Sequence, residues 1–310
     1  MKFGVTLAGL RFRDYAAVVA AYEDCGFESV WIPEHLVFPA DMPPRYPYTA
    51  TGQPPVTADT PTYDPWVVLG YVAAMTTRIR LATNVYILPL RHPLQTARSV
   101  VTVDRVSGGR VTLGVGVGWL PDEFDYVGVD FASRGRQADA AIDAIRRLWS
   151  EDVVTVDDGH FRFGPVKFQP KPLQKPSVPI EVGGAAPAAL RRAGRLGDGW
   201  IEIGSADVDQ FSARLAVVRG ARHDAGRTGP FEVTASGTLA SAGGTPAGRV
   251  GGAAGGSAGG AVTLDGVRRL ADAGATRVVV GPGSVDGGPL TAADAVAWAG
   301  RFADEILGRL

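Results

Sequence analysis

The chain has 310 residues, of which 45% are hydrophobic, and its formal net charge is −1. This length allows one large domain or two ordinary ones, and the balanced charge excludes the basic face that nucleic-acid binding needs. Cys25 is the single cysteine, so an internal disulfide and an all-cysteine metal site are excluded. No apolar run is long enough to span a membrane, and no signal peptide precedes the first strand, so we expect a cytoplasmic protein.

Strands and helices alternate through the first half of the chain. Asp14 is suited to begin a helix and Gly26 to end it, and Asp64-Pro65 is typical of a helix start. Residues 36–63 are rich in Pro, Tyr and Thr without a clear period, which predicts a long functional or mobile insertion. We expect strands at 2–7, 27–32, 79–85 and 110–115, and helices at 14–25, 64–76, 93–106 and 133–149.

The second half continues the alternation with two interruptions. Residues 153–169 alternate in polarity around Asp157-Asp158-Gly159, which predicts a β-hairpin. Residues 241–261 are mostly Gly and Ala, which predicts a flexible loop. We expect further strands at 179–182, 199–203, 231–239 and 276–280, and helices at 187–196, 208–225, 264–273 and 292–307.

Eight strands alternating with eight helices predict an α/β fold of the (β/α)8 TIM-barrel type, as a single domain over 1–310 with insertions after strands two, four and seven. The alternative is a doubly wound sheet. It usually carries a glycine fingerprint after its first strand, and Leu7-Ala8-Gly9-Leu10 is not one. In a barrel the active site lies at the C-terminal ends of the strands, so the residues there are the candidate site residues.

The third strand ends in an unusual way. Residues 86–90 are apolar although they lie between a strand and a helix, where a polar loop is typical. Either a planar cofactor lies against this segment or another part of the chain buries it. Asn84 and Val85 end the strand, and Asn tolerates unusual backbone geometry. A strained or cis peptide here would make a bulge on which a ring can rest.

Polar groups follow two other strands. His35, after Glu34 at the end of strand two, is suited to proton transfer or to a hydrogen bond with a cofactor, or is satisfied by the 36–63 insertion. Glu123, beyond strand four, is either a site group or a carboxylate at a helix start.

Glycines alternate at the end of strand four, at Gly114, Gly116 and Gly118, and Trp119 follows. Missing side chains at these positions allow either a ligand to approach the backbone or a helix and strand to pack closely.

Gly183-Gly184-Ala185 follow strand five and lead into a helix whose first N–H groups are suited to phosphate. A metal site is not indicated, because the histidines at 35, 92, 160 and 223 lack ligand spacing. A Gly-x-Ser-x-Gly match at 255–259 lies in the Gly/Ala run without the strand that a nucleophile elbow needs.

Several stretches carry a family resemblance. They are residues 26–35 (GFESVWIPEH), 77–85 (TRIRLATNV), 88–93 (LPLRHP), 104–110 (DRVSGGR), 113–119 (LGVGVGW), and 183–184 with 189–200 (GG, ALRRAGRLGDGW). As a set they resemble the luciferase-like monooxygenase superfamily, in particular its actinobacterial branch of deazaflavin (coenzyme F420)-dependent oxidoreductases. The resemblance implies the same barrel. The sequence departs from the family's pattern at Glu34, where Asp is common, and at His92, where Asn is common.

The resemblance also implies a site. The cofactor ring is expected over a non-prolyl cis peptide near Asn84-Val85, with His35 beside the reacting carbon and Glu123 near the ring as the second catalytic group. The family's phosphate-contacting backbone corresponds to Gly183 and Gly184, with Ala185 next to them. Glu34, Gly116, Gly118 and Trp119 are further expected cofactor contacts, and no metal is expected.

The function implied by the resemblance is hydride transfer between coenzyme F420 and an organic small molecule. The first alternative is an FMN-dependent monooxygenase that uses O2 and reduced flavin from a separate reductase. The second alternative is a barrel without catalysis that binds a ligand or serves as a partner subunit. Family members are commonly dimers, so a homodimer is expected, with neither nucleic acid nor membrane as a partner.

Overall fold

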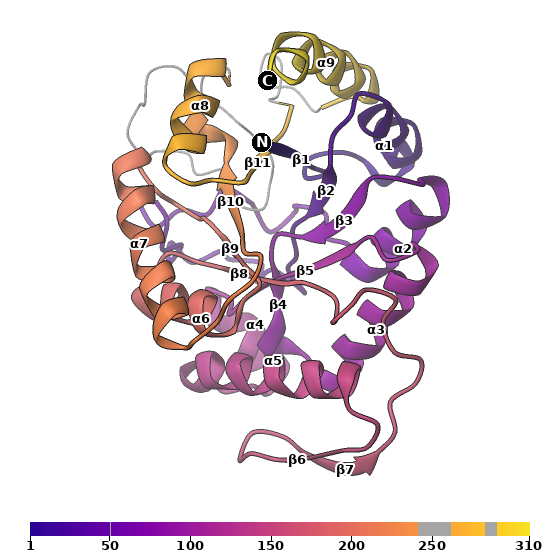
Figure 1. Ribbon diagram of the computed structural model, residues 1–310, viewed down its shortest axis with the longest axis vertical. Coiled ribbons are helices and arrows are strands. Elements are labelled where there is room, and N and C mark those ends of the chain that lie inside the picture. Colours follow the sequence, from indigo (N-terminus) through magenta and orange to yellow (C-terminus); the bar gives the residue numbers. More distant parts are fainter. Residues whose placement is uncertain (50, 241–261, 283–289) are drawn as a thin grey trace.

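Parallel strands close into a barrel in the computed structural model, which describes residues 1–49, 51–240, 262–282 and 290–310 (Figure 1). Within these residues the strand order is β3-β2-β1-β11-β10-β9-β8-β5, and pairing between β3 and β5 closes the ring of eight strands. The strands are β1 (Lys2–Thr6), β2 (Ser29–Ile32), β3 (Arg80–Thr83), β5 (Val111–Gly116), β8 (Ile180–Gly183), β9 (Gly199–Ile201), β10 (Glu232–Ser236) and β11 (Arg277–Val280). The predicted TIM barrel is confirmed.

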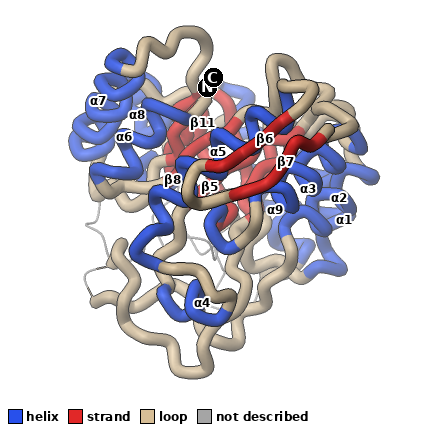
Figure 2. Tube along the Cα trace, turned by 90° about the horizontal axis from the view of Figure 1, so that it is seen from below, coloured by secondary structure: helices blue, strands red, loops and turns tan. Residues whose placement is uncertain are grey.

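Helices surround the barrel, and most of the long loops gather with α4 at the end opposite the chain termini (Figures 1 and 2). The helices are α1 (Tyr15–Asp24), α2 (Pro65–Met75), α3 (Pro93–Val106), α4 (Pro121–Tyr126), α5 (Arg134–Ser150), α6 (Pro187–Leu196), α7 (Val208–Asp224), α8 (Leu264–Asp272) and α9 (Ala292–Glu305). The predicted hairpin is confirmed as the antiparallel pair β6 (Val154–Asp157) and β7 (Arg162–Val166). The predicted loop at 241–261 lies outside the described residues.

The starts of helices α2 and α1 test the helix caps that the sequence predicts. Asp64 caps α2, because its carboxylate accepts from the amides of Trp66 and Val67. Asp14 occupies the N-cap position of α1, as predicted, but without a capping hydrogen bond. Its carboxylate pairs with Arg11 instead, since a 3-10 turn comes first.

The barrel interior is filled in layers. At the N-terminal end Arg277 is buried and donates to Glu181 Oε1 at 2.8 Å and to Glu28 Oε2 at 3.1 Å. Above Arg277 and its two carboxylate partners, Trp31 is fully buried against Ala82 and Ile201. A buried charge is tolerated only when it is paired, and the bulky indole fills the middle of the barrel. A ligand cavity therefore has room only at the C-terminal end.

Strands β3 and β5 approach closely at Gly114. A Cβ at this position would lie 1.9 Å from the carbonyl oxygen of Thr83, whose hydroxyl donates to the Gly114 carbonyl at 2.7 Å. Gly114 therefore serves close packing between strands, whereas the sequence had suggested either the approach of a ligand or the packing of a helix against the strand.

We predict that Gly114→Ala lowers the free energy of unfolding by about 2 kcal/mol or more, because the added methyl group forces β3 and β5 apart. Chemical denaturation followed by circular dichroism measures the change. Gly220→Ala is the matched control: Gly220 lies within α7 with nothing in contact range of a new Cβ, so this change should stabilise by about 0.5–1 kcal/mol. Equal stability of Gly114→Ala and the parent protein would contradict the packing argument.

Candidate active site

A cavity of about 1110 Å³ lies at the C-terminal ends of the barrel strands. Its walls come from the residues that end the strands, from the 36–63 insertion, which contributes Tyr46 and Tyr48, and from the second half of α9, so the volume includes space along that helix. This is the end at which barrel enzymes hold their substrates, and the volume exceeds the roughly 300–1,000 Å³ of an ordinary ligand pocket.

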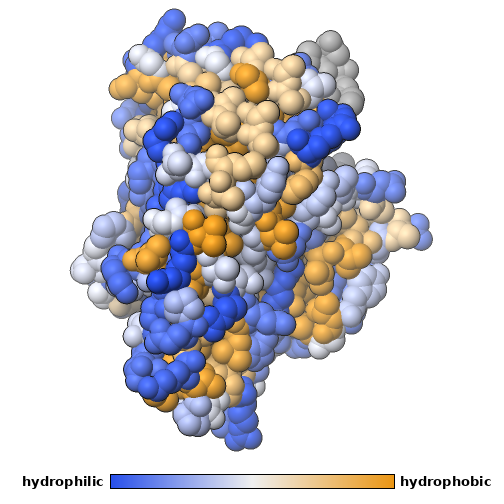
Figure 3. Space-filling view, turned by 90° about the vertical axis from the view of Figure 1, so that its right-hand side faces the viewer, coloured by the Kyte–Doolittle hydropathy of each residue, from blue (hydrophilic) through white to orange (hydrophobic). Residues whose placement is uncertain are grey.

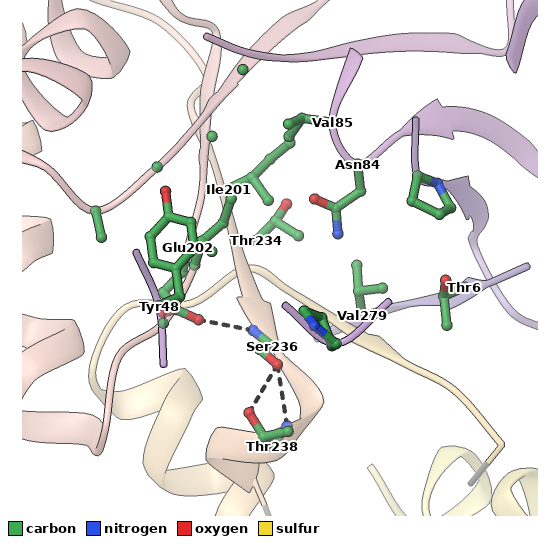
Figure 4. Close-up of a pocket in the computed structure, with 18 of the residues that line it drawn as sticks. Thr6, Tyr48, Asn84, Val85, Ile201, Glu202, Thr234, Ser236, Thr238 and Val279 are labelled. Atoms are coloured by element: carbon green, nitrogen blue, oxygen red, sulfur yellow. Dashed lines mark hydrogen bonds between the residues drawn. The ribbon is translucent and has the colours of Figure 1, made fainter. Parts of the chain in front are cut away.

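Val85 forms a raised surface on one wall of this cavity (Figure 4). The peptide bond between Asn84 and Val85 is cis, as expected. The Val85 side chain lies between two neighbouring strands, because a Cβ on Gly116 would meet it at 2.4 Å and a Cβ on Gly183 at 2.7 Å. These two glycines therefore make room for Val85, and the residues together give the cavity an apolar surface suited to a planar ring.

The apolar segment after Val85 is folded rather than irregular. Residues Tyr86–Ile87 form the short strand β4, which pairs with β5, and Leu88–Leu90 form a 3-10 turn. The sequence did not predict this strand. The interpretation that another part of the chain buries this segment is confirmed. Ile87 also lines the cavity, so a cofactor against the segment stays a prediction.

His35 and Glu123 form a buried pair at the cavity wall. His35 Nδ1 lies 2.8 Å from Glu123 Oε2, and the other carboxylate oxygen accepts from the Leu36 amide at 2.7 Å and the Val37 amide at 3.4 Å. Glu123 stands in the first turn of α4, so its interpretation as a carboxylate at a helix start is confirmed, although no helix at 121–126 was among those expected. With Nδ1 facing the carboxylate, Nε2 is the imidazole nitrogen that a ligand can contact.

Trp119 stands next to His35 in the cavity wall. Its ring meets the His35 ring edge-on at 5.6 Å between centroids, and both line the cavity. Gly118 sets this position: its φ of +78° suits glycine, and a Cβ there would meet Ile87 and Phe124 at 2.8 Å. Gly118 thus positions Trp119 by close packing.

Glu34 ties the end of β2 to the segment after β3. Its buried Oε2 accepts from the Ile87 amide at 2.6 Å, and its other oxygen pairs with Arg91. Arg91 in turn lies over the Tyr86 ring at 4.7 Å. Burial raises the pKa of Glu34 to about 7, against the lowering effect of Arg91 and the Ile87 N–H. Glu34 lines the cavity, so its predicted role as a cofactor contact stays a prediction beside this bracing role.

Backbone amides gather at the start of α6. The Gly184 amide, at a φ of +132°, donates to the Ile201 carbonyl at 3.3 Å, so it is engaged within the barrel. Within the described part of the chain no acceptor contacts the amides of Ala185 and Ala186, both of which line the cavity. These amides are better suited to an anion than that of Gly184, and the predicted contact at Ala185 stays open to test.

Several cavity residues were not found by sequence reasoning. Glu202 directly follows β9, so the rule that selected His35 would have found it; Tyr46 and Tyr48 lie in the unpatterned insertion, and Arg134 and Arg214 lie on helices. Burial raises the pKa of Glu202, opposed by hydrogen bonds from Ser205 and Ser236 and by Arg214. Among the described residues, no cluster of His, Cys, Asp and Glu is suited to a metal ion, and no helix has the length and apolarity to cross a membrane.

We predict a specific pH dependence from Glu34. Because its folded pKa of about 7 lies above the ordinary 4.5, the folded protein keeps a proton that the unfolded chain has released. The stabilising contribution is complete below about pH 4.5 and is lost as the pH rises through about 7. The unfolding free energy of the parent protein should therefore fall, relative to Glu34→Gln, between about pH 4.5 and pH 7 in chemical denaturation.

Glu23→Gln is the control for this series. Burial raises the Glu23 pKa, but hydrogen bonds from the amides of Ile79, Arg78 and Thr77 outweigh it and lower the pKa overall. Its contribution is lost only as the pH falls below the ordinary value of the pKa. The difference in unfolding free energy between the parent protein and Glu23→Gln should therefore stay constant across the same window. If the two differences, parent protein minus Glu34→Gln and parent protein minus Glu23→Gln, change equally with pH, Glu34 is not the source of the pH dependence.

Comparisons with known proteins agree with this architecture. Residues 2–245 match the family described as luciferase-like monooxygenase. An uncharacterised protein of Mycobacterium tuberculosis is 34% identical over 281 residues, covering 91% of this chain and 89% of its own.

Two solved structures share the fold. The monooxygenase RslO1 of Streptomyces bottropensis has a TM-score of 0.72 and 23% identity, covering 100% of this chain and 99% of its own. The coenzyme F420-dependent tetrahydromethanopterin reductase of Methanopyrus kandleri has a TM-score of 0.71 and 18% identity, covering 99% of both chains. On the match over residues 2–245, the chain belongs to the luciferase-like monooxygenase family.

Proposed function

We propose that this protein is an oxidoreductase that transfers a hydride between deazaflavin coenzyme F420 and an organic small molecule. The observation that carries the proposal is the buried His35–Glu123 pair, whose imidazole lines the same cavity as the raised surface at Asn84-Val85. A proton-transfer group next to a flat apolar surface is the arrangement that two-electron chemistry on a ring cofactor needs.

The walls of the cavity fit such a cofactor. Val85 offers a flat apolar contact for the ring, and the Ala185 and Ala186 amides at the start of α6 are suited to its phosphate. Arg134 lines the same cavity and adds a positive charge. When bound, the deazaflavin supplies a carbon that gives or accepts a hydride.

The chain's own residues supply orientation and a proton. Glu123 holds His35 through Nδ1, which leaves Nε2 to donate to or accept from an oxygen of the substrate. The amides of Leu36 and Val37 hold Glu123 in turn, so the pair is fixed before any ligand binds. Trp119 and the 36–63 insertion limit the access of water to this corner.

The alternative is an FMN-dependent monooxygenase, for which the fold shared with RslO1 is the supporting observation. It would need O2 and a separate reductase, whereas a deazaflavin hardly reacts with oxygen. A non-catalytic barrel is the remaining alternative, and the fixed His35–Glu123 pair speaks against it.

We predict that His35→Ala lowers turnover about 100-fold or more, because the proton donor is lost while the surface that receives the ring is kept. The assay follows F420 absorbance without oxygen, in the oxidised form with a panel of secondary alcohols and in the reduced form with the corresponding ketones.

His223→Ala is the control, since the His223 side chain is 91% exposed and lies on α7 away from the cavity. Full turnover by His35→Ala would remove His35 from the mechanism. Turnover that appears only with O2 and reduced FMN would favour the monooxygenase instead.

We also propose that the protein is a homodimer. Val67, Tyr71 and Met75 follow one another at helical spacing along α2 with 70%, 39% and 37% of their surface exposed. Figure 3 looks at the side of the molecule that carries α1, α2 and α3, where apolar groups are exposed among polar ones. Such a stripe on a helix is typical of a surface that a second copy covers.

We predict that light scattering gives twice the chain mass for the parent protein and a single chain mass for Tyr71→Glu, because a buried charge without a partner opposes association. Tyr126→Glu, at a position that is 60% exposed on α4, should keep the mass of the parent. A monomeric parent protein would contradict the proposal.

A further inference from the structure

A row of aromatic side chains forms one wall of the cavity. It starts at His35, whose ring centroid lies 5.6 Å from that of Trp119. Trp119 lies 5.0 Å from Tyr46, and Tyr46 lies 5.3 Å from Tyr48. All four line the cavity. Neighbouring rings in this row meet edge to face, with 73–82° between their planes, so the row presents both ring faces and ring edges. The two tyrosines come from the 36–63 insertion, which therefore gives the cavity an aromatic wall against which an aromatic ligand can pack.

Tyr48 brings the row to a second polar corner. Gly204, with a φ of +71°, lies directly beneath it, since a Cβ there would meet the Tyr48 ring at 2.9 Å. The charges of Arg214 and Glu202 both act on the Tyr48 hydroxyl. Figure 4 shows Tyr48 next to Glu202, across the cavity from Asn84 and Val85. The aromatic wall thus joins the His35 corner to the Glu202 corner.

Glu202 keeps capacity to accept a hydrogen bond. The carboxylate is buried at 4% exposure, and its Oε1 accepts from the Ser205 amide at 2.5 Å with Arg214 Nη1 at 3.9 Å. Among the described residues, Oε2 has one long contact, from the Ser236 amide at 3.4 Å. A carboxylate oxygen accepts two hydrogen bonds, so Oε2 is suited to a donor on a ligand.

We propose that the substrate is a planar aromatic molecule carrying a hydroxyl group. Its ring packs against Tyr46 and Tyr48, and its hydroxyl donates to Glu202 Oε2. The inference rests on the proposed function in one respect: the cofactor takes the Val85 side, and the cavity of about 1110 Å³ leaves the opposite side for a second molecule.

The test uses two probes that differ in one donor. 2-Naphthol has the planar ring and the hydroxyl, and 2-methoxynaphthalene has the same ring and oxygen without the O–H. Fluorescence titration of the full-length protein, with and without saturating F420, gives a Kd for each probe. We expect 2-naphthol to bind about tenfold more tightly than 2-methoxynaphthalene, which is the usual worth of a hydrogen bond to a buried carboxylate.

Variants separate the two parts of the proposal. Glu202→Leu should remove the preference for 2-naphthol, whereas Tyr48→Leu should weaken both probes about threefold to tenfold and keep the preference. Asp224→Asn, which changes an exposed carboxylate on α7, and Tyr126→Leu are the matched controls. Thermal melts check folding, and Tyr48→Leu still tests the aromatic wall if Glu202→Leu does not fold.

The outcomes are distinct from those of the proposed function. Equal affinity of the parent protein for both probes, or an undiminished preference in Glu202→Leu, would overturn the proposal. If Glu202→Leu weakens F420 binding and leaves the probes unaffected, the carboxylate contacts the sugar-alcohol chain of the cofactor, and the proposal is also overturned. Failure of the parent protein to bind F420, with the 2-naphthol preference intact, would count against the hydride-transfer function alone.

Discussion

The steric fit of Val85 between Gly116 and Gly183 is the contact on which the rest of the site depends. Three strands contribute to this fit, because the side chain that follows β3 occupies the space that Gly116 on β5 and Gly183 on β8 leave by having no Cβ. A larger residue at either glycine would push Val85 into the cavity. The flat wall, and with it the room for a planar cofactor, follows from this packing.

Two buried carboxylates stabilise the surroundings in different ways. Glu34 holds the segment after β3 against the end of β2 through Ile87 and Arg91, and Glu123 holds the imidazole of His35. Because Glu34 and His35 are adjacent in sequence, the end of β2 is fixed from two directions. The raised pKa of Glu34 shows that burial outweighs the nearby cation there, which makes this brace sensitive to pH near neutrality.

Local sequence signals predicted the barrel well and the site in part. The helix starts at Pro65, Pro93 and Pro187 follow directly from the fixed φ of proline, and strand alternation gave the fold. The structure brings His35 and Asn84-Val85 to one cavity and pairs Glu123 with His35, because the ends of parallel strands meet at one rim, while their roles in the site stay predictions.

What the sequence could not predict depends on contacts between distant residues. Arg91 gains its role only by pairing with Glu34, and Tyr48 only by lying over Gly204 beside Glu202. The helix α4 spans only Pro121–Tyr126, too short for a periodic pattern to reveal it. The missing capping bond of Asp14 has the same kind of cause, since Arg11 pairs with the carboxylate that would otherwise cap α1.

The most direct measurement is a pair of fluorescence titrations of the purified protein, one with deazaflavin F420 and one with FMN. The account predicts that F420 binds at least about tenfold more tightly than FMN. Tighter binding of FMN would contradict the hydride-transfer assignment and support the monooxygenase. Binding of neither would contradict the central claim that this cavity holds a ring cofactor.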